Sequence, residues 1–343
     1  MTKTNTNLYW ADNIRFVATI FVIIIHVTAP VVENYSRINY NYWKIANLID
    51  SLCRCSVPLF VMLSGAFLLG KEETTALFFR KRTKKILLPF LVWSCVYLVM
   101  SYVSTFIFNS STNNNLVEWI MMKITHGTSY HLWYIYMIIG LYLMIPFLVK
   151  MIKSLQRKDY LLFFFIWLLT LLLHWPIVAS FLPNFDFTFF TGYIGYLLLG
   201  YFLSTINLKF LDLKTGISIA VLGWIMTFLL TDFSTAEDHK LVEIYYEYLT
   251  PNVALTAIGV FIIFKNFNPE NIPFNKLSNL ISKYSYGIYL NHVLILTFLY
   301  RIGISWKFIN PLIGIFLTFF TCLIISVIIV WLTEILRLRK YLG

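Results

Sequence analysis

Long runs of apolar residues recur along this 343-residue chain and limit its fold more than any other feature. A bilayer-spanning helix needs about 20 such residues. Because 59% of the residues are hydrophobic and only 13% are charged, the chain cannot hide its apolar surface in one soluble core. We predict an all-α integral membrane protein, one transmembrane domain over residues 1–343, with about ten helices near 12–33, 48–69, 86–108, 131–149, 160–176, 188–205, 215–231, 251–266, 284–301 and 309–334.

The formal net charge of +11 would suggest a nucleic-acid partner in a soluble protein. Sorted by predicted loop, however, 19 lysines and arginines fall on the side of the N-terminus and 6 on the other. Cytoplasmic loops carry such an excess. We therefore predict that both termini are cytoplasmic, that membrane lipid is a partner and that nucleic acid is not.

The first predicted helix has no basic segment before it and no small-residue cleavage site after it, so we expect it to stay as an anchor. Cys53, Cys55, Cys95 and Cys322 all fall within predicted helices. This pattern supports neither a disulfide framework nor a zinc site, and we expect no metal.

The first predicted helix carries Arg15 and, eleven residues later, His26. Eleven residues make about three helical turns, so both side chains share one face, roughly 16 Å apart along the axis. Charged groups inside a membrane usually have a task or a partner. The alternative is that Arg15 reaches to lipid phosphate while His26 is a structural interior histidine.

Further polar residues interrupt the other apolar runs. Arg54 is near the outer end of the second predicted helix, where it could instead pair with Asp50 one turn earlier. Small residues at Ser64 and Gly65 favour helix packing or a helix break, with backbone donation as a further alternative. A basic run before the third helix is typical of a topology determinant, a lipid-phosphate patch or a ligand site; it contains Arg80, Lys81, Arg82, Lys84 and Lys85.

Aromatic and histidine residues begin the fourth predicted helix and occupy the ninth. His131 and Trp133 fit an interfacial aromatic belt as well as a substrate contact. In the ninth helix, Tyr289 and His292 could line the same cavity, together with Tyr284 and Ser285.

Five short motifs follow one another in a fixed order: Arg15 and His26 in the first helix, VPLFVMLSG, RKRTKKILLPFLVW, HLWY and SYGIYLNH. In this order they resemble the membrane-bound acyltransferase-3 family, with most similarity to its WecH-type O-acetyltransferases. The resemblance implies a multi-pass enzyme of the bacterial plasma membrane. Such an enzyme moves an acyl group, here an acetyl group, from cytosolic acyl-CoA to a hydroxyl of a cell-surface or lipid-linked glycan. Acetyl-CoA would be a donor substrate, and no permanently bound cofactor is expected.

Within this interpretation the candidate residues take chemical roles. His26 suits a general base or a transient acyl carrier, and we favour the base. Arg15 suits CoA phosphates or the orientation of an acid, and Arg80, Arg82 and Lys85 would add phosphate contacts. Asp12 either caps the first helix or pairs with Arg15, and Glu334 either orients Arg15 or is a structural acid. The acceptor would meet Arg54, His131, Trp133, Tyr289 and His292.

Two other classes of protein share parts of this pattern. A polysaccharide exporter or secondary transporter also has about ten helices and buried charges, but usually shows matched broken helices in two halves. We find no such pairing in the sequence. A non-catalytic sensor would need few ionisable groups within its helices, whereas this chain has Arg15, His26, Arg54 and His292.

Overall fold

The computed structural model describes residues 9–108, 116–173, 175, 178, 192–206, 210–267 and 275–343. Regular structure in these ranges is helical, without a strand, and a helix lies in every one of the ten predicted ranges. A helix satisfies its own backbone hydrogen bonds, which lipid cannot do. The predicted all-α class is therefore confirmed.

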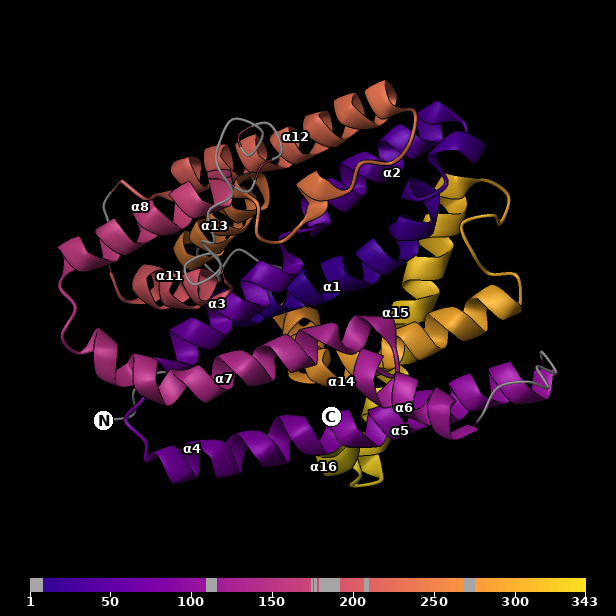
Figure 1. Cartoon of the computed structure of the whole chain (residues 1–343), viewed down its shortest axis with the longest axis horizontal. Helices are drawn as coiled ribbons and strands as arrows, with labels where there is room; N and C mark the ends of the chain where they lie inside the picture. Colours follow the sequence, from indigo (N-terminus) through magenta and orange to yellow (C-terminus); the bar gives the residue numbers. More distant parts are fainter. Residues whose placement is uncertain are drawn as a thin grey trace.

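The long helices are arranged as one bundle (Figure 1). Their bounds are α1 Tyr9–Val32, α2 Tyr40–Cys53, α3 Ser56–Leu68, α4 Thr75–Arg82, α5 Leu88–Tyr102, α6 Leu116–His126, α7 Trp133–Ile152, α8 Arg157–Leu173, α11 Ile194–Thr205, α12 Leu213–Asp238, α13 Pro251–Asn266, α14 Asn275–Arg301, α15 Pro311–Ile335 and the short α16 Arg339–Leu342. A π-helical segment, Thr83–Leu87, joins α4 to α5, and a second, Val103–Phe108, follows α5. The turn η5, Tyr130–Leu132, leads into α7.

Seven helical segments of the described chain are long and apolar enough to cross a membrane. They are Tyr9–Val32, Tyr40–Leu68, Thr75–Thr105, Tyr130–Ile152, Leu213–Asp238, Ile244–Asn266 and Pro311–Ile335. Of the other three predicted spans, α8 has 17 residues and α11 has 12, and the first half of α14 is rich in polar residues. The chain is thus a multi-pass membrane protein, whereas the count of ten and the orientation remain predictions.

Small residues allow α3 and α11 to touch along their backbones. A Cβ atom added to Gly65 would lie 1.8 Å from the carbonyl oxygen of Leu197, and one added to Gly200 would lie 2.0 Å from that of Met62. Such close approach is typical of membrane helix pairs. Gly65 is therefore a packing residue, which is the first of the alternatives that the sequence leaves open.

Helix α1 runs through the middle of the bundle and contacts α2, α3, α13, α14 and α15 (Figure 1). Its apolar side chains join two buried clusters, one shared with α3 and α13 and the other with α14 and α15. This central place means that both Arg15 and His26 face other helices. Neither has the lipid-facing position of a peripheral residue.

Candidate functional site

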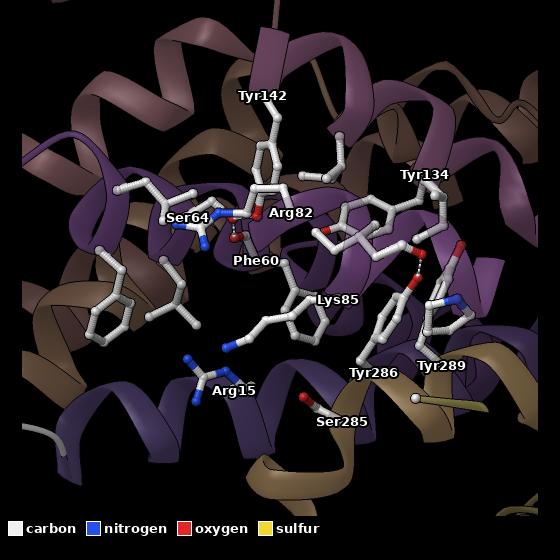
Figure 2. A pocket seen from close by; sticks show the side chains of 18 of the residues that line it. Arg15, Phe60, Ser64, Arg82, Lys85, Tyr134, Tyr142, Ser285, Tyr286 and Tyr289 are labelled. Atoms are coloured by element: carbon white, nitrogen blue, oxygen red, sulfur yellow. Dashed lines mark hydrogen bonds between the residues drawn. The ribbon is translucent and has the colours of Figure 1, made fainter. Parts of the chain in front are cut away.

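A cavity of about 870 Å³ lies beside the first half of α1 and is lined from α1, α3, α4, α5, α7, α14 and α16 and from the π-helical segment before α5. Its rim is basic. Eight cations line it: Arg15, Lys71, Arg82, Lys84, Lys85, Lys283, Arg339 and Lys340. We call the part of the bundle that they surround the basic end. Figure 2 shows Arg15, Arg82 and Lys85 pointing into one space.

Among the described residues, half of these cations have no carboxylate within ion-pair distance. Arg15, Arg82, Lys283 and Arg339 each lie within 4.0 Å of a carboxylate, on Asp12, Glu73 or Glu334. In the described part of the chain, no carboxylate lies within that distance of Lys71, Lys84, Lys85 or Lys340. Unpaired ammonium groups around one hollow attract a multiply charged anion, because their charges add.

Arg15 is held in place at this rim. Its Nη1 donates to Asp12 Oδ1 at 2.8 Å and to Ser282 Oγ at 3.0 Å, and Ser282 donates in turn to the same carboxylate oxygen at 2.6 Å. Asp12 therefore pairs with Arg15, one of its two predicted roles. Glu334 takes its structural alternative, because it binds Lys283 at 2.7 Å and Arg339 at 3.6 Å, and neither of its ion pairs is with Arg15.

Tyrosines line the opposite, deeper end of the cavity. Tyr286 donates to the carbonyl of Ile86 at 2.7 Å, and Tyr134 and Tyr289 lie ring to ring at 5.5 Å. The hydroxyl of Tyr289 donates to the backbone carbonyl of His131. Tyr289 therefore lines the cavity (Figure 2) and also contacts His131, which does not line it.

Behind Tyr289, three histidines from distant parts of the chain come together: His26 from α1, His131 from η5 and His292 from α14. The ring centroid of His292 is 5.1 Å from that of His26 and 5.2 Å from that of His131, and those two are 6.5 Å apart. The ring of Tyr289 lies 5.5 Å from His131 and 5.9 Å from His292. We call these three residues the histidine cluster.

The three imidazoles differ in their exposure. His131 and His292 are buried, with exposed fractions of 2% and 0%, whereas His26 is only partly buried. In the described ranges, no group of three His, Cys, Asp or Glu side chains is arranged to hold a metal ion.

Two residues that the sequence predicts for the site lie outside both the basic cavity and the histidine cluster. Arg80 is exposed and is not among the residues that line the cavity, although Arg82 and Lys85 are. Trp133 is 39% exposed and stacks on Tyr248 with centroids 5.5 Å apart. Trp133 is two positions from His131 and Arg80 is five positions from Lys85, and residues at these spacings face different sides of a helix.

Arg54 occupies a third place, where its charge is already paired. Its Nη2 and Nε lie 2.5 and 2.6 Å from Asp50 Oδ2, and its guanidinium lies 4.1 Å from the ring centroid of Tyr246. Thr28, two residues beyond His26, donates to the other oxygen of Asp50 at 2.7 Å. The pair of Arg54 with Asp50 thus exists, and the hydrogen bond from Thr28 ties Asp50 of α2 to α1.

The profile of the acyltransferase-3 family, described as an acyltransferase domain, matches residues 8–331. The chain belongs to this family. No curated protein and no solved structure gives a significant match. The match covers nearly the whole of this acyltransferase and includes the histidine cluster and most of the cavity lining, whereas Arg339 and Lys340 lie beyond it.

The cavity of this acyltransferase is also lined by residues that its sequence does not single out. Lys283 reaches the cavity from α14, and Arg339 and Lys340 reach it from α16, which packs against α5. Arg339 donates to the carbonyl of Lys283 at 2.8 Å, and Trp93 of α5 donates to that of Leu342 at 3.1 Å. In the sequence these cations only indicate topology. The cavity tyrosines Tyr134 and Tyr286 lie in two of the sequence motifs, HLWY and SYGIYLNH, but nothing in the sequence marks them as cavity residues.

Proposed function

We propose that this acyltransferase transfers an acetyl group from cytosolic acetyl-CoA to a hydroxyl of a cell-surface or lipid-linked glycan, as WecH-type O-acetyltransferases do. The basic end would face the cytosol of a bacterial cell, with the enzyme in the plasma membrane. Both termini would then be cytoplasmic. Membership of the acyltransferase-3 family supports the reaction class.

One observation carries the proposal: a single cavity leads from unpaired cations to a tyrosine that contacts the histidine cluster. CoA has its phosphates at one end and its thioester at the other. Phosphates suit the lysine and arginine rim. A volume of about 870 Å³ is within the usual range for cofactor-sized ligands.

The chemistry then needs one base near the thioester. The acceptor hydroxyl attacks the thioester carbonyl while His26 takes its proton, and the C–S bond breaks as the tetrahedral intermediate collapses. The proton on His26 passes to the departing CoA sulfur. Because His26 is partly exposed and does not line the basic cavity, the acceptor would reach it from the opposite side of Tyr289.

The test is donor turnover by the full-length protein reconstituted in lipid. With acetyl-CoA and a glycan extract from the source membrane, we expect free CoA to appear together with acetylated glycan, detected by mass spectrometry. A polysaccharide exporter or secondary transporter would move glycan across the bilayer without consuming acetyl-CoA. That outcome would exclude the transferase proposal.

Neutralising a cavity lysine should weaken donor binding alone. Lys85→Gln removes an unpaired cation at the rim, so we expect the KM for acetyl-CoA to rise about tenfold, since a charge-assisted contact is worth roughly 1.5–3 kcal/mol. Arg80→Gln is the matched control, because Arg80 is in the same basic run but outside the cavity. Steady-state CoA release measures both variants, and an equal rise in the two would refute a donor site at this rim.

A further inference from the structure

Two backbone carbonyl groups fix the tautomer of His292. Its Nδ1 lies 2.7 Å from the carbonyl oxygen of Tyr289 and 3.2 Å from that of Ile288. Carbonyl oxygens only accept hydrogen bonds, so Nδ1 carries the hydrogen. In the neutral ring, Nε2 is then an acceptor with a free lone pair.

This acceptor has no partner. Nε2 of His292 is buried and makes no hydrogen bond in the described part of the chain, and the whole residue is 0% exposed. Leaving a buried acceptor unpaired costs free energy. This nitrogen is therefore free to accept a hydrogen bond from a neighbouring ring of the histidine cluster.

Two rings are near enough to supply that partner, His26 at 5.1 Å and His131 at 5.2 Å between centroids, and His26 is the partly exposed one. With about 2.9 Å between nitrogens, two hydrogen-bonded imidazoles have centroids roughly 5 Å apart, and the His26 and His292 centroids are 5.1 Å apart with planes inclined by 34°. A rotation of the His26 ring at this separation would bring its N–H to Nε2. Catalytic hydrogen bonds often tighten in this way once substrate is bound.

His131 is less suited than His292 to accept a hydrogen bond from His26. Its ring is 6.5 Å from that of His26, farther than a direct hydrogen bond allows. Its Nδ1 lies 2.9 Å from the hydroxyl of Ser129, which can donate or accept, so this bond imposes neither tautomer. Its Nε2, like that of His292, is buried without a hydrogen-bond partner among the described residues. Only His292 combines a fixed tautomer with a suitable distance.

We propose that His292 is the positioning partner of His26: its unprotonated Nε2 accepts the ring N–H of His26 and leaves the other His26 nitrogen free to take the acceptor's proton. The second nitrogen gains that proton as the hydroxyl attacks, and the resulting imidazolium keeps its bond to His292. The proton then leaves with CoA. This inference rests on the proposed transfer reaction and assigns the orienting role that a carboxylate has in other triads.

Two neutral substitutions separate the two nitrogens of His292. Asparagine can replace the donor Nδ1 but not the acceptor Nε2, whereas glutamine can place an amide oxygen near Nε2. We expect His292→Asn to lower kcat for acetyl transfer about 100-fold, with the KM for acetyl-CoA unchanged because His292 does not line the donor cavity. His292→Gln should retain much of the activity, and the same two changes at His131 should show no preference for glutamine.

A wild-type measurement tests the tautomer without any loss of folding. In protein labelled with ¹⁵N-histidine and reconstituted in lipid, NMR should show His292 protonated at Nδ1 and bare at Nε2. Protonation at Nε2 would overturn the proposal, as would equal activity of the Asn and Gln variants. Both results differ from failure of the proposed function, in which wild-type protein consumes no acetyl-CoA.

Discussion

Replacing His26 by alanine is expected to lower kcat for acetyl transfer by about 10³-fold, because general-base catalysis contributes roughly 10²–10⁴-fold. His26 is the partly exposed member of the histidine cluster and so the one that substrate can reach. Since it does not line the donor cavity, the KM for acetyl-CoA should stay within about twofold of the wild-type value. Initial rates of CoA release and glycan acetylation measure both quantities.

His126→Ala is the control for this variant, because His126 is exposed and lies outside the histidine cluster. It should leave kcat and KM unchanged. If His26→Ala keeps the wild-type rate of acetyl transfer while the protein remains folded, His26 is not the base. A large rise in KM with kcat unchanged would instead make His26 a donor-binding residue.

Much of this fold can be predicted from local properties of the sequence. Hydropathy locates helices because each spanning segment must be apolar over its own length. The same reasoning places Arg15 and His26 on one face of α1, since both belong to one helix and its geometry is fixed. In the structure both residues do lie on one helix, because α1 is continuous from Tyr9 to Val32.

Boundaries are less predictable where the sequence is amphipathic. The predicted second helix, 48–69, is two helices, α2 and α3, which meet at Arg54 and Cys55. Helix α2 begins at Tyr40, before the predicted start at residue 48. The prediction misses its first turns because they carry asparagine and lysine, which lower the mean hydropathy. Helix α4 likewise precedes the predicted start at residue 86, and its basic composition hides it.

Long-range contacts account for the rest of the site. Arg80 and Lys85 look equivalent in the sequence of the basic run, yet of the two only Lys85 lines the cavity. The run is helical, with a π-helical segment at Thr83–Leu87, so its side chains point to different sides. Lys340 reaches the same cavity from the other end of the chain. Spacing along the helix separates Arg80 from Lys85, but which of the two faces the cavity depends on where the other helices lie, and this the sequence alone cannot supply.

Replacing Asp50 by alanine is expected to reduce the free energy of unfolding by about 3–5 kcal/mol, since it leaves a buried charge without its partner. The side chain of Asp50 is 0% exposed, and that of Arg54 is 17% exposed. The change also removes the acceptor of Thr28 and so loosens α2 from α1 beside the histidine cluster. Thermal unfolding of the detergent-solubilised protein, followed by tryptophan fluorescence, should show a much lower midpoint.

The double variant Asp50→Ala/Arg54→Met separates the charge from the packing. Removing both members of a buried ion pair is often nearly neutral, because no unpaired charge remains. We therefore expect most of the lost stability to return, and equal instability of the single and double variants would show that the unpaired Arg54 is not the cause. Activity of the refolded double variant then decides the predicted substrate role of Arg54. If the KM for glycan rises while the KM for acetyl-CoA does not, Arg54 contacts the acceptor; if both are unchanged, its role is the ion pair alone.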